Sequence, residues 1–194
     1  LTGHERQIAL SEFPSPEELF KRYQESKNIS EAEMEIINQP YYTSQTTYAP
    51  RYYQQICVNR TVDAIVRGQN RILLTMATGT GKTYTAFQIV YRLLKKEMIH
   101  KVLYLADRNI LVDQSIQQDF APLEKVIHKI NFAKDDPLTI TSYSVFFSLY
   151  QQLTGNEERE EDDSDEDAAM RFADLFKRDF FDLVIVDECH RGSA

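Results

Sequence analysis

The sequence predicts an α/β fold in which a parallel sheet is flanked by helices and preceded by a short helical segment. Two observations predict this fold. From residue 51 onward, amphipathic helical patterns alternate with short apolar runs, as expected when helices connect the strands of a parallel sheet. A Gly-rich loop at residues 76–83 stands between such a run and such a helix, and ligands of these folds bind beyond the carboxyl ends of the strands.

Two helices are predicted ahead of this main body. Ser15 and Ser30 are each followed by Glu three positions later, which is the capping-box pattern of a helix start. We therefore expect helices from about 16 to 26 and from about 31 to 38. The polar, tyrosine-rich residues 39–50 show no periodicity and are expected to form a linker. These patterns divide the chain into a helical connector, residues 1–50, and a main domain, residues 51–194.

Hydrophobic periodicity predicts the order of elements in the main domain. A helix is expected from residue 51 to Gly68, followed by the strand 71–76, the helix 84–96, the strand 101–106, the helix 110–120, the strands 125–130 and 138–141, a helix to about 153, a helix 168–177 and the strand 182–187.

Residues 76–83, with the sequence M-A-T-G-T-G-K-T, form a predicted phosphate-binding loop. Glycines let backbone N–H groups surround phosphate oxygens, and the helix that follows adds its positive N-terminal end. Lys82 would bind the β and γ phosphates, and the Thr83 hydroxyl would hold Mg²⁺. The general pattern G-x-x-x-x-G-K-[ST] has glycine where this chain has Met76. The predicted nucleotide contacts in the loop are Thr78, Gly79, Thr80, Gly81, Lys82 and Thr83.

An acidic pair ends the last apolar run. Asp187 and Glu188 follow L-V-I-V, the pattern of a buried parallel strand that places carboxylates at its carboxyl end. Asp187 is expected to hold Mg²⁺ through water, and Glu188 is expected to orient or deprotonate the water that attacks the γ phosphate. Lys82, Asp187 and Glu188 are thus the predicted catalytic residues of a nucleotide hydrolase.

Composition argues against several classes of protein. Cys57 and Cys189 have neither disulfide nor metal-ligand spacing, which favours reduced thiols in a cytoplasmic protein. The four histidines are scattered and do not suggest zinc. The apolar runs are too short for a membrane span, and no charged and apolar leader opens the sequence. We therefore expect a soluble protein without a membrane partner.

The formal net charge of −8 arises in one segment. Residues 157–167 contain nine acidic residues and Arg159, and the rest of the chain has equal numbers of acidic and basic residues. A like-charged block of this kind is typical of a solvated, mobile loop. The net charge therefore does not argue against binding to DNA, and the role of the block stays open.

Several motifs together resemble a known family. G-T-G-K-T at residues 79–83 and D-E-C-H at residues 187–190 resemble motifs I and II of superfamily 2 helicases and translocases, whose first motor domain is a RecA-like P-loop NTPase domain. P-R-Y-Y-Q-Q at residues 50–55, the loop that starts at Met76, L-A-D-R at residues 105–108 and the string D-E-C-H-R-G-S occur in that order. This set resembles the R subunit, the nuclease and motor subunit, of type I restriction enzymes.

The resemblance implies that the chain is the first RecA-like domain of an ATP-dependent DNA translocase, truncated at its C-terminal end. The cofactors would be ATP and Mg²⁺, and the whole subunit would pump and cleave double-stranded DNA as part of a type I site-specific deoxyribonuclease. Its partners would be methyltransferase and specificity subunits. The nuclease residues and a second motor domain, which supplies an arginine finger, would lie outside residues 1–194, and the DNA recognition sequence would belong to a separate subunit.

The resemblance also implies roles for further residues. Gln54 resembles the glutamine that reads adenine, and His190 resembles the motif II histidine that links the nucleotide site to the nucleic-acid side. Arg108 and the run Thr141, Ser142 and Tyr143, each expected at the end of a strand, resemble segments that touch the DNA backbone.

Two alternative functions stay open. The chain could belong to another superfamily 2 helicase that acts on DNA or RNA, or it could be a nucleotide-binding interaction module without turnover. A nuclease domain encoded upstream, or neighbouring methyltransferase and specificity genes, would distinguish the restriction subunit from both.

Overall fold

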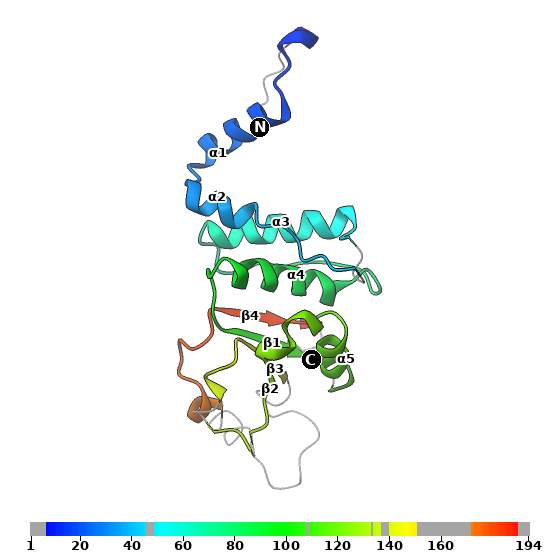
Figure 1. Ribbon diagram of the computed structural model, residues 1–194, viewed down its shortest axis with the longest axis vertical. Helices are drawn as coiled ribbons and strands as arrows, with labels where there is room; N and C mark the ends of the chain where they lie inside the picture. The colour runs from blue at the N-terminus through cyan, green and yellow to red at the C-terminus, as the bar shows by residue number, and fades with distance from the viewer. Residues whose placement is uncertain are drawn as a thin grey trace.

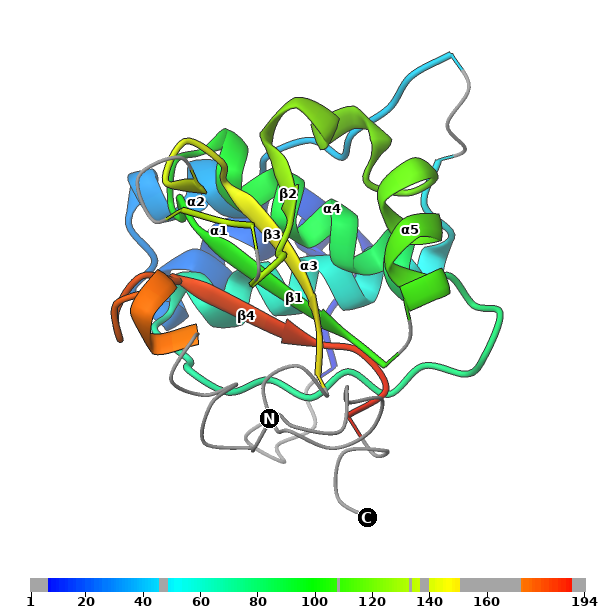
Figure 2. The ribbon, with the colours of Figure 1, turned by 90° about the horizontal axis from the view of Figure 1, so that it is seen from below.

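Four parallel strands form the sheet in the computed structural model, which describes residues 7–45, 49–107, 109–132, 134–136, 140–150 and 172–189. They are β1 (Val102–Ala106), β2 (Ile127–Lys129), β3 (Val145–Leu149) and β4 (Leu183–Val186). Their spatial order is β2-β3-β1-β4, and each neighbouring pair is parallel. The carboxyl ends of the strands therefore meet at one edge of the sheet (Figure 2). The predicted parallel sheet flanked by helices is confirmed.

Helices are stacked on one face of this sheet. α4 (Lys82–Lys95) lies next to the strands, and α3 (Tyr52–Val66) lies on the outer side of α4 (Figure 1). α5 (Asn109–Gln117) follows β1. Buried apolar side chains from α3, α4 and the sheet form one continuous core, whose largest members are Phe87, Leu93, Tyr104, Phe120 and Phe147.

The opposite face of the sheet has its own apolar cluster. Leu103, Leu105 and Phe146 contribute to it from the strands, and Phe176 contributes from the segment before β4. Successive side chains of a strand point to opposite faces, so Tyr104 enters the first core while its neighbours Leu103 and Leu105 enter the second. Both faces of β1 are covered, which explains why all five of its residues are buried.

Two short helices precede the main body, as predicted. α1 (Pro16–Lys27) and α2 (Glu31–Ile37) both have Ser at the N-cap, and the complete capping box occurs at Ser30, whose backbone N–H donates to Glu33 at 2.7 Å. α1 projects away from the sheet (Figure 1), and none of its residues, all of which the structure describes, is buried. A short 3-10 helix, η1 (Leu10–Glu12), precedes it, and another, η2 (Ala121–Val126), leads into β2.

The segment that follows α2 packs on α4. Gln88, which is fully buried, accepts a hydrogen bond from the Tyr42 backbone N–H at 2.9 Å and donates one to the Tyr42 carbonyl at 3.1 Å. The Tyr42 ring meets Phe87 edge-on at 5.5 Å. Residues 39–45 have no helix or strand, as expected of a linker, but these contacts fix part of them to the main domain. The division of the chain at residue 50 stays a prediction.

A buried arginine makes a second attachment between α4 and this segment. Arg92 donates to the Asn59 side chain of α3 at 2.7 Å and to the Ile37 carbonyl at the end of α2. Its guanidinium also lies 5.0 Å from the centre of the Tyr41 ring, within the range of a cation–π contact. Arg92 therefore joins α2, α3 and α4 through a charged group that is shielded from water.

The predicted strand at residues 71–76 is wrong. These residues have no regular secondary structure, and Leu73 is 76% exposed. A strand requires a neighbour for its backbone hydrogen bonds, and β4, the end strand of the sheet, has no further strand beside it among the described residues. Val184 of β4 is correspondingly 50% exposed.

The region around residues 138–153 also differs from its prediction. Val145–Leu149 forms strand β3, where a helix was expected, and Ile140 and Thr141 lie in a helical turn instead of a strand. A short, continuously buried apolar run fits a buried strand and a buried helix equally well by periodicity, which explains the error. The other strands and helices appear close to their expected positions, with residues 172–175 helical, and the acidic block 157–167 lies outside the described residues.

Three predictions of absence can be compared with the described part of the chain. No helix there is long and apolar enough to span a membrane. Cys57 and Cys189 are free thiols. Among these residues, no group of three or more His, Cys, Asp or Glu side chains is placed to bind a metal ion.

The Arg92 contacts predict a clear effect on stability. Arg92→Met keeps the aliphatic stem but leaves Asn59 and the Ile37 carbonyl without a charged donor, and it should lower the free energy of unfolding by about 2 kcal/mol. Urea unfolding followed by circular dichroism measures this change. Lys95→Met, on the exposed side of the same helix, is the matched control and should stay within about 0.5 kcal/mol of wild type. Equal stability of the two variants would show that the buried guanidinium does not hold the helices together.

Candidate nucleotide-binding site

The Gly-rich loop turns sharply into the first residue of α4. Gly79 and Gly81 have φ angles of +76° and +81°, a region that residues with a Cβ rarely adopt. A Cβ on Gly81 would also lie 2.5 Å from Nε2 of Gln54. Gly81 occupies the N-cap position of α4, with Lys82 and Thr83 as the first two helical residues. The loop thus presents a helix N-terminus, which favours anions.

Hydrogen bonds within the loop fix its shape. The Thr80 hydroxyl donates to the Ala77 carbonyl at 2.6 Å, and the Thr85 hydroxyl donates to the Gly81 carbonyl at 2.9 Å. Gln54 of α3 donates to the Thr80 carbonyl at 2.9 Å. The loop conformation is therefore determined by its own side chains and by one residue of the neighbouring helix.

Gln54, the predicted reader of adenine, is buried against this loop. Besides its bond to Thr80, its Oε1 accepts a hydrogen bond from the Arg51 backbone N–H at 2.8 Å. The amide keeps one further N–H and one further lone pair. In this structure Gln54 links the start of α3 to the phosphate loop, a role that the sequence analysis did not anticipate.

The acidic pair lies next to the phosphate loop. Nζ of Lys82 is 2.7 Å from Oε1 of Glu188, and both side chains are about three-quarters buried, with 27% and 22% of their surfaces exposed. Glu188 has a φ angle of +50°, which is uncommon for a residue with a side chain. The structure thus brings together two of the three predicted catalytic residues, which come from elements about a hundred positions apart in the sequence.

Asp187, the third predicted catalytic residue, extends the ladder of β4. Its backbone N–H donates to the Leu105 carbonyl at 2.9 Å. Its Oδ1 accepts from the Glu188 backbone N–H at 3.0 Å, and its Oδ2 accepts from the Tyr104 hydroxyl at 3.0 Å. The carboxylate is therefore held at both oxygens.

Tyr104 is the site residue that the sequence analysis missed. Burial raises the pKa of its phenol far above the ordinary value, and the negative charge of Asp187 raises the pKa further, while a hydrogen bond from the Thr83 side chain acts in the opposite direction. The sequence feature that pointed to Tyr104 is a tyrosine in the middle of the otherwise aliphatic strand V-L-Y-L-A. A buried phenol usually requires a hydrogen-bond partner.

The oxygen atoms at this place fit a magnesium ion. Mg²⁺ is commonly held by one or two protein oxygens while it keeps several waters. The Tyr104 hydroxyl donates to the Asp187 carboxylate, and the Thr83 side chain is near enough to the same phenol to lower its pKa, so the two expected magnesium contacts are close to each other. Lys82 supplies the positive charge beside them.

Of the other predicted site residues, Arg108 and His190 lie outside the described residues. Thr141, Ser142 and Tyr143 precede β3, so they lie at the amino end of the strands, opposite the edge that carries Asp187. The expectation that they follow a strand is wrong. Lys101, which precedes β1, donates to the Thr141 and Tyr143 carbonyls at this amino end.

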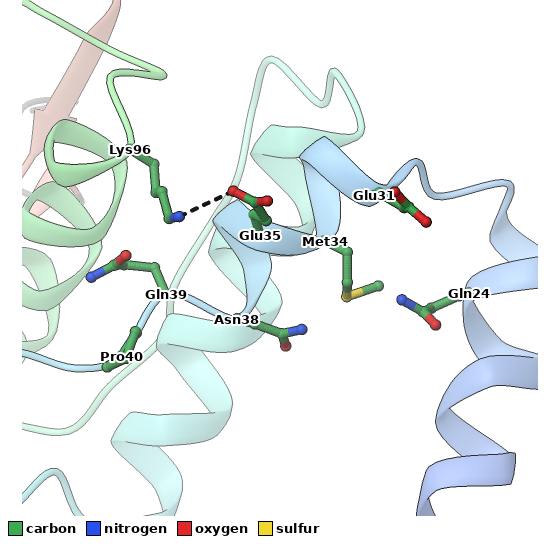
Figure 3. Close-up of a pocket in the computed structure, with 8 residues that line it drawn as sticks. All are labelled: Gln24, Glu31, Met34, Glu35, Asn38, Gln39, Pro40 and Lys96. Atoms are coloured by element: carbon green, nitrogen blue, oxygen red, sulfur yellow. Dashed lines mark hydrogen bonds and ion pairs between the residues drawn. The ribbon is translucent and has the colours of Figure 1, made fainter.

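A pocket of about 450 Å³ lies elsewhere, between α1, α2 and the end of α4 (Figure 3). Lys96 reaches Glu35 across it at 3.4 Å. Lys82 and Lys96 stand at opposite ends of α4, about 20 Å apart at the rise of an α-helix. The pocket is therefore distinct from the candidate nucleotide site.

Comparisons with known proteins identify the family. The family ResIII, described as "Type III restriction enzyme, res subunit", matches residues 47–194. The endonuclease subunit of the type I restriction enzyme EcoAI from Escherichia coli is 46% identical over 190 residues, which cover 98% of this chain and 22% of that protein. The endonuclease subunit of EcoKI from Escherichia coli strain K12 is 32% identical over 152 residues, which cover 73% of this chain and 12% of that protein.

A solved structure agrees with these matches. A fragment of an HsdR subunit of a type I restriction enzyme from Vibrio vulnificus YJ016 has a TM-score of 0.67 and 34% identity, covering 93% of this chain and 29% of that one. The present chain spans about a fifth or less of the length of the curated relatives. The predicted RecA-like fold is confirmed. The chain belongs to the restriction-enzyme family ResIII, and its predicted resemblance to the R subunits of type I restriction enzymes is confirmed.

Proposed function

We propose that this chain is the ATP-binding first half of a motor that moves double-stranded DNA through a type I restriction endonuclease. One observation carries the proposal: the phosphate loop and the acidic pair meet, with Lys82 2.7 Å from Glu188 and with Thr83 close to the tyrosine hydroxyl that bonds to Asp187. A helix N-terminus, a lysine and two carboxylates at one place are the groups that phosphoryl transfer from a nucleotide requires.

The Lys82–Glu188 pair defines the first step of the proposed reaction. The triphosphate of ATP would bind over the N-terminus of α4, and Lys82 would turn from Glu188 to the β and γ phosphates. This exchange would separate the Glu188 carboxylate from its lysine, so that it could accept a hydrogen bond from a water molecule. Glu188 would then orient that water, or take its proton, as it attacks the γ phosphorus.

The remaining site residues would bind magnesium and adenine. Mg²⁺, when bound, neutralises charge that develops on the phosphate oxygens. Asp187 would hold it through water, and Thr83 would bind it through its hydroxyl. Gln54 would read adenine with the amide hydrogen and lone pair that its bonds to Thr80 and Arg51 leave over.

The similarity to endonuclease subunits supports the proposed setting of this motor. The full protein would be cytoplasmic, would act on DNA, and would assemble with methyltransferase and specificity subunits. The part of the subunit outside these residues would cleave DNA and complete the ATP site. His190 and Arg108 keep their predicted roles in coupling and DNA contact as part of the proposal. For Thr141, Ser142 and Tyr143, the position at the amino end of β3 offers the predicted DNA contact no support.

Lys82→Ala tests the nucleotide site. The variant lacks the charge for the β and γ phosphates, so DNA-dependent ATPase activity of the full subunit in its complex should fall at least about 100-fold. Lys95→Ala, at the other end of α4, is the matched control and should retain wild-type activity. Circular dichroism of both variants checks that the fold is intact. ATPase activity of Lys82→Ala at the wild-type level would refute the proposed function.

Glu188→Gln separates binding from turnover. Loss of the carboxylate should reduce the turnover number about 100-fold or more, because the group that activates water is removed. Nucleotide affinity should not decrease, since Lys82 no longer has to leave an ion pair. Calorimetric titration with a non-hydrolysable ATP analogue measures the affinity, and steady-state kinetics measure turnover. A parallel loss of both would contradict the separate roles of Glu188 and Asp187, and a wild-type subunit without ATPase activity would favour an interaction module.

A further inference from the structure

We propose that Tyr104 is a positioning residue whose hydroxyl holds Asp187 of the acidic pair, beside Thr83 of the phosphate loop, in the arrangement that receives a magnesium–nucleotide complex. The inference rests on the proposed function of this site and assigns one further residue to it. Tyr104 acts through Asp187 and not on the nucleotide itself.

Strand register explains why this side chain reaches the site. β1 and β4 are parallel, and Tyr104 is paired with Ile185. Residues two positions apart on a strand share a face, so Asp187 lies on the same face as Ile185 and Tyr104, two residues nearer the carboxyl edge than Ile185. The long phenol side chain of Tyr104 spans this offset, and its hydroxyl donates to Oδ2 of Asp187 at 3.0 Å.

The packed core fixes the position of the ring. Tyr104 is only 1% exposed. Its ring stacks on Phe147 of β3 at 4.9 Å and meets Phe120 edge-on at 5.6 Å. Close packing of this kind leaves a side chain one rotamer. The hydroxyl is therefore placed by the sheet and not by the phosphate loop.

Two contacts restrain the Asp187 carboxylate. Tyr104 binds one oxygen, and the Glu188 backbone N–H binds the other at 3.0 Å, so rotation of the carboxylate would break at least one hydrogen bond. Each oxygen still has a lone pair for a water of the magnesium shell. A metal ligand held by such outer contacts needs no rearrangement when the metal arrives.

The side chain of Thr83 lies near the same hydroxyl. The Thr83 side chain acts on the Tyr104 phenol and lowers its pKa, so the first turn of α4 lies close to the hydroxyl that bonds to Asp187 at the end of β4. One hydroxyl thus stands between the two expected magnesium contacts and restrains one of them. A phenylalanine would fill the same space in the core but could not make the bond to Asp187.

Tyr104→Phe tests this inference in the full subunit within its complex. Binding of a fluorescent, non-hydrolysable ATP analogue is titrated with Mg²⁺, and ATPase activity is measured over the same Mg²⁺ range. The Mg²⁺ concentration for half-maximal effect should rise about five- to tenfold in both assays, as expected for the loss of a hydrogen bond to a charged, metal-binding group. Affinity for the analogue without Mg²⁺ should change less than about twofold, and turnover at saturating Mg²⁺ less than about threefold.

Tyr41→Phe is the matched control, since it removes a tyrosine hydroxyl that bonds to Asn59 at 2.8 Å, away from the site. It should keep the wild-type Mg²⁺ dependence, and melting curves show whether both variants fold. A wild-type Mg²⁺ dependence in Tyr104→Phe would overturn the inference, and so would an equal loss of binding with and without Mg²⁺. Lys82→Ala separates a failure of the Tyr104 role from a failure of the proposed function. If Lys82→Ala abolishes nucleotide binding while Tyr104→Phe has no effect, the proposed function stands and only the positioning role fails.

Discussion

The parallel pairing of β1 with β4 is the constraint on which the candidate site depends. It aligns Tyr104 with Ile185 and is continued by the bond from the Asp187 backbone to the Leu105 carbonyl at 2.9 Å. A shift of one residue in this register would turn Asp187 to the opposite face of the sheet. The carboxylate would then point away from α4, and neither Lys82 nor Thr83 could share a site with it.

Helix α4 serves two parts of the molecule at once. Its first turn carries Lys82 and Thr83, and its later turns carry Gln88 and Arg92, which hold the segment after α2. A helix in a packed core moves as a rigid body. Any displacement of α4 that accompanies nucleotide binding must therefore be accommodated at Tyr42 and at the end of α2. Helix α2 is in this sense attached through α4 to the Gly-rich loop.

Local patterns in the sequence were sufficient for the first two helix starts and for the glycine turn before α4, because their physical causes lie within a few residues. The errors occurred where structure depends on distant neighbours. Residues 71–76 have the composition of a strand but no strand beside them among the described residues, and Val145–Leu149 is a buried run whose periodicity suits helix and strand alike. The contacts of Tyr104 and Gln54 could not be read from spacing, since each joins elements whose relative position is set by the tertiary fold.

Charge exchange gives the site its order of events in the proposed function. Without nucleotide, Lys82 neutralises Glu188 at 2.7 Å, so two carboxylates and the positive end of α4 coexist with one lysine. Bound phosphates would attract that lysine, so the Glu188 carboxylate would leave its ion pair only when nucleotide is present. Asp187, held by Tyr104 and by the backbone, would keep its position during this exchange. In this proposal the lysine is the group that moves, the aspartate is the group that stays, and activation of water by the glutamate follows binding of the nucleotide.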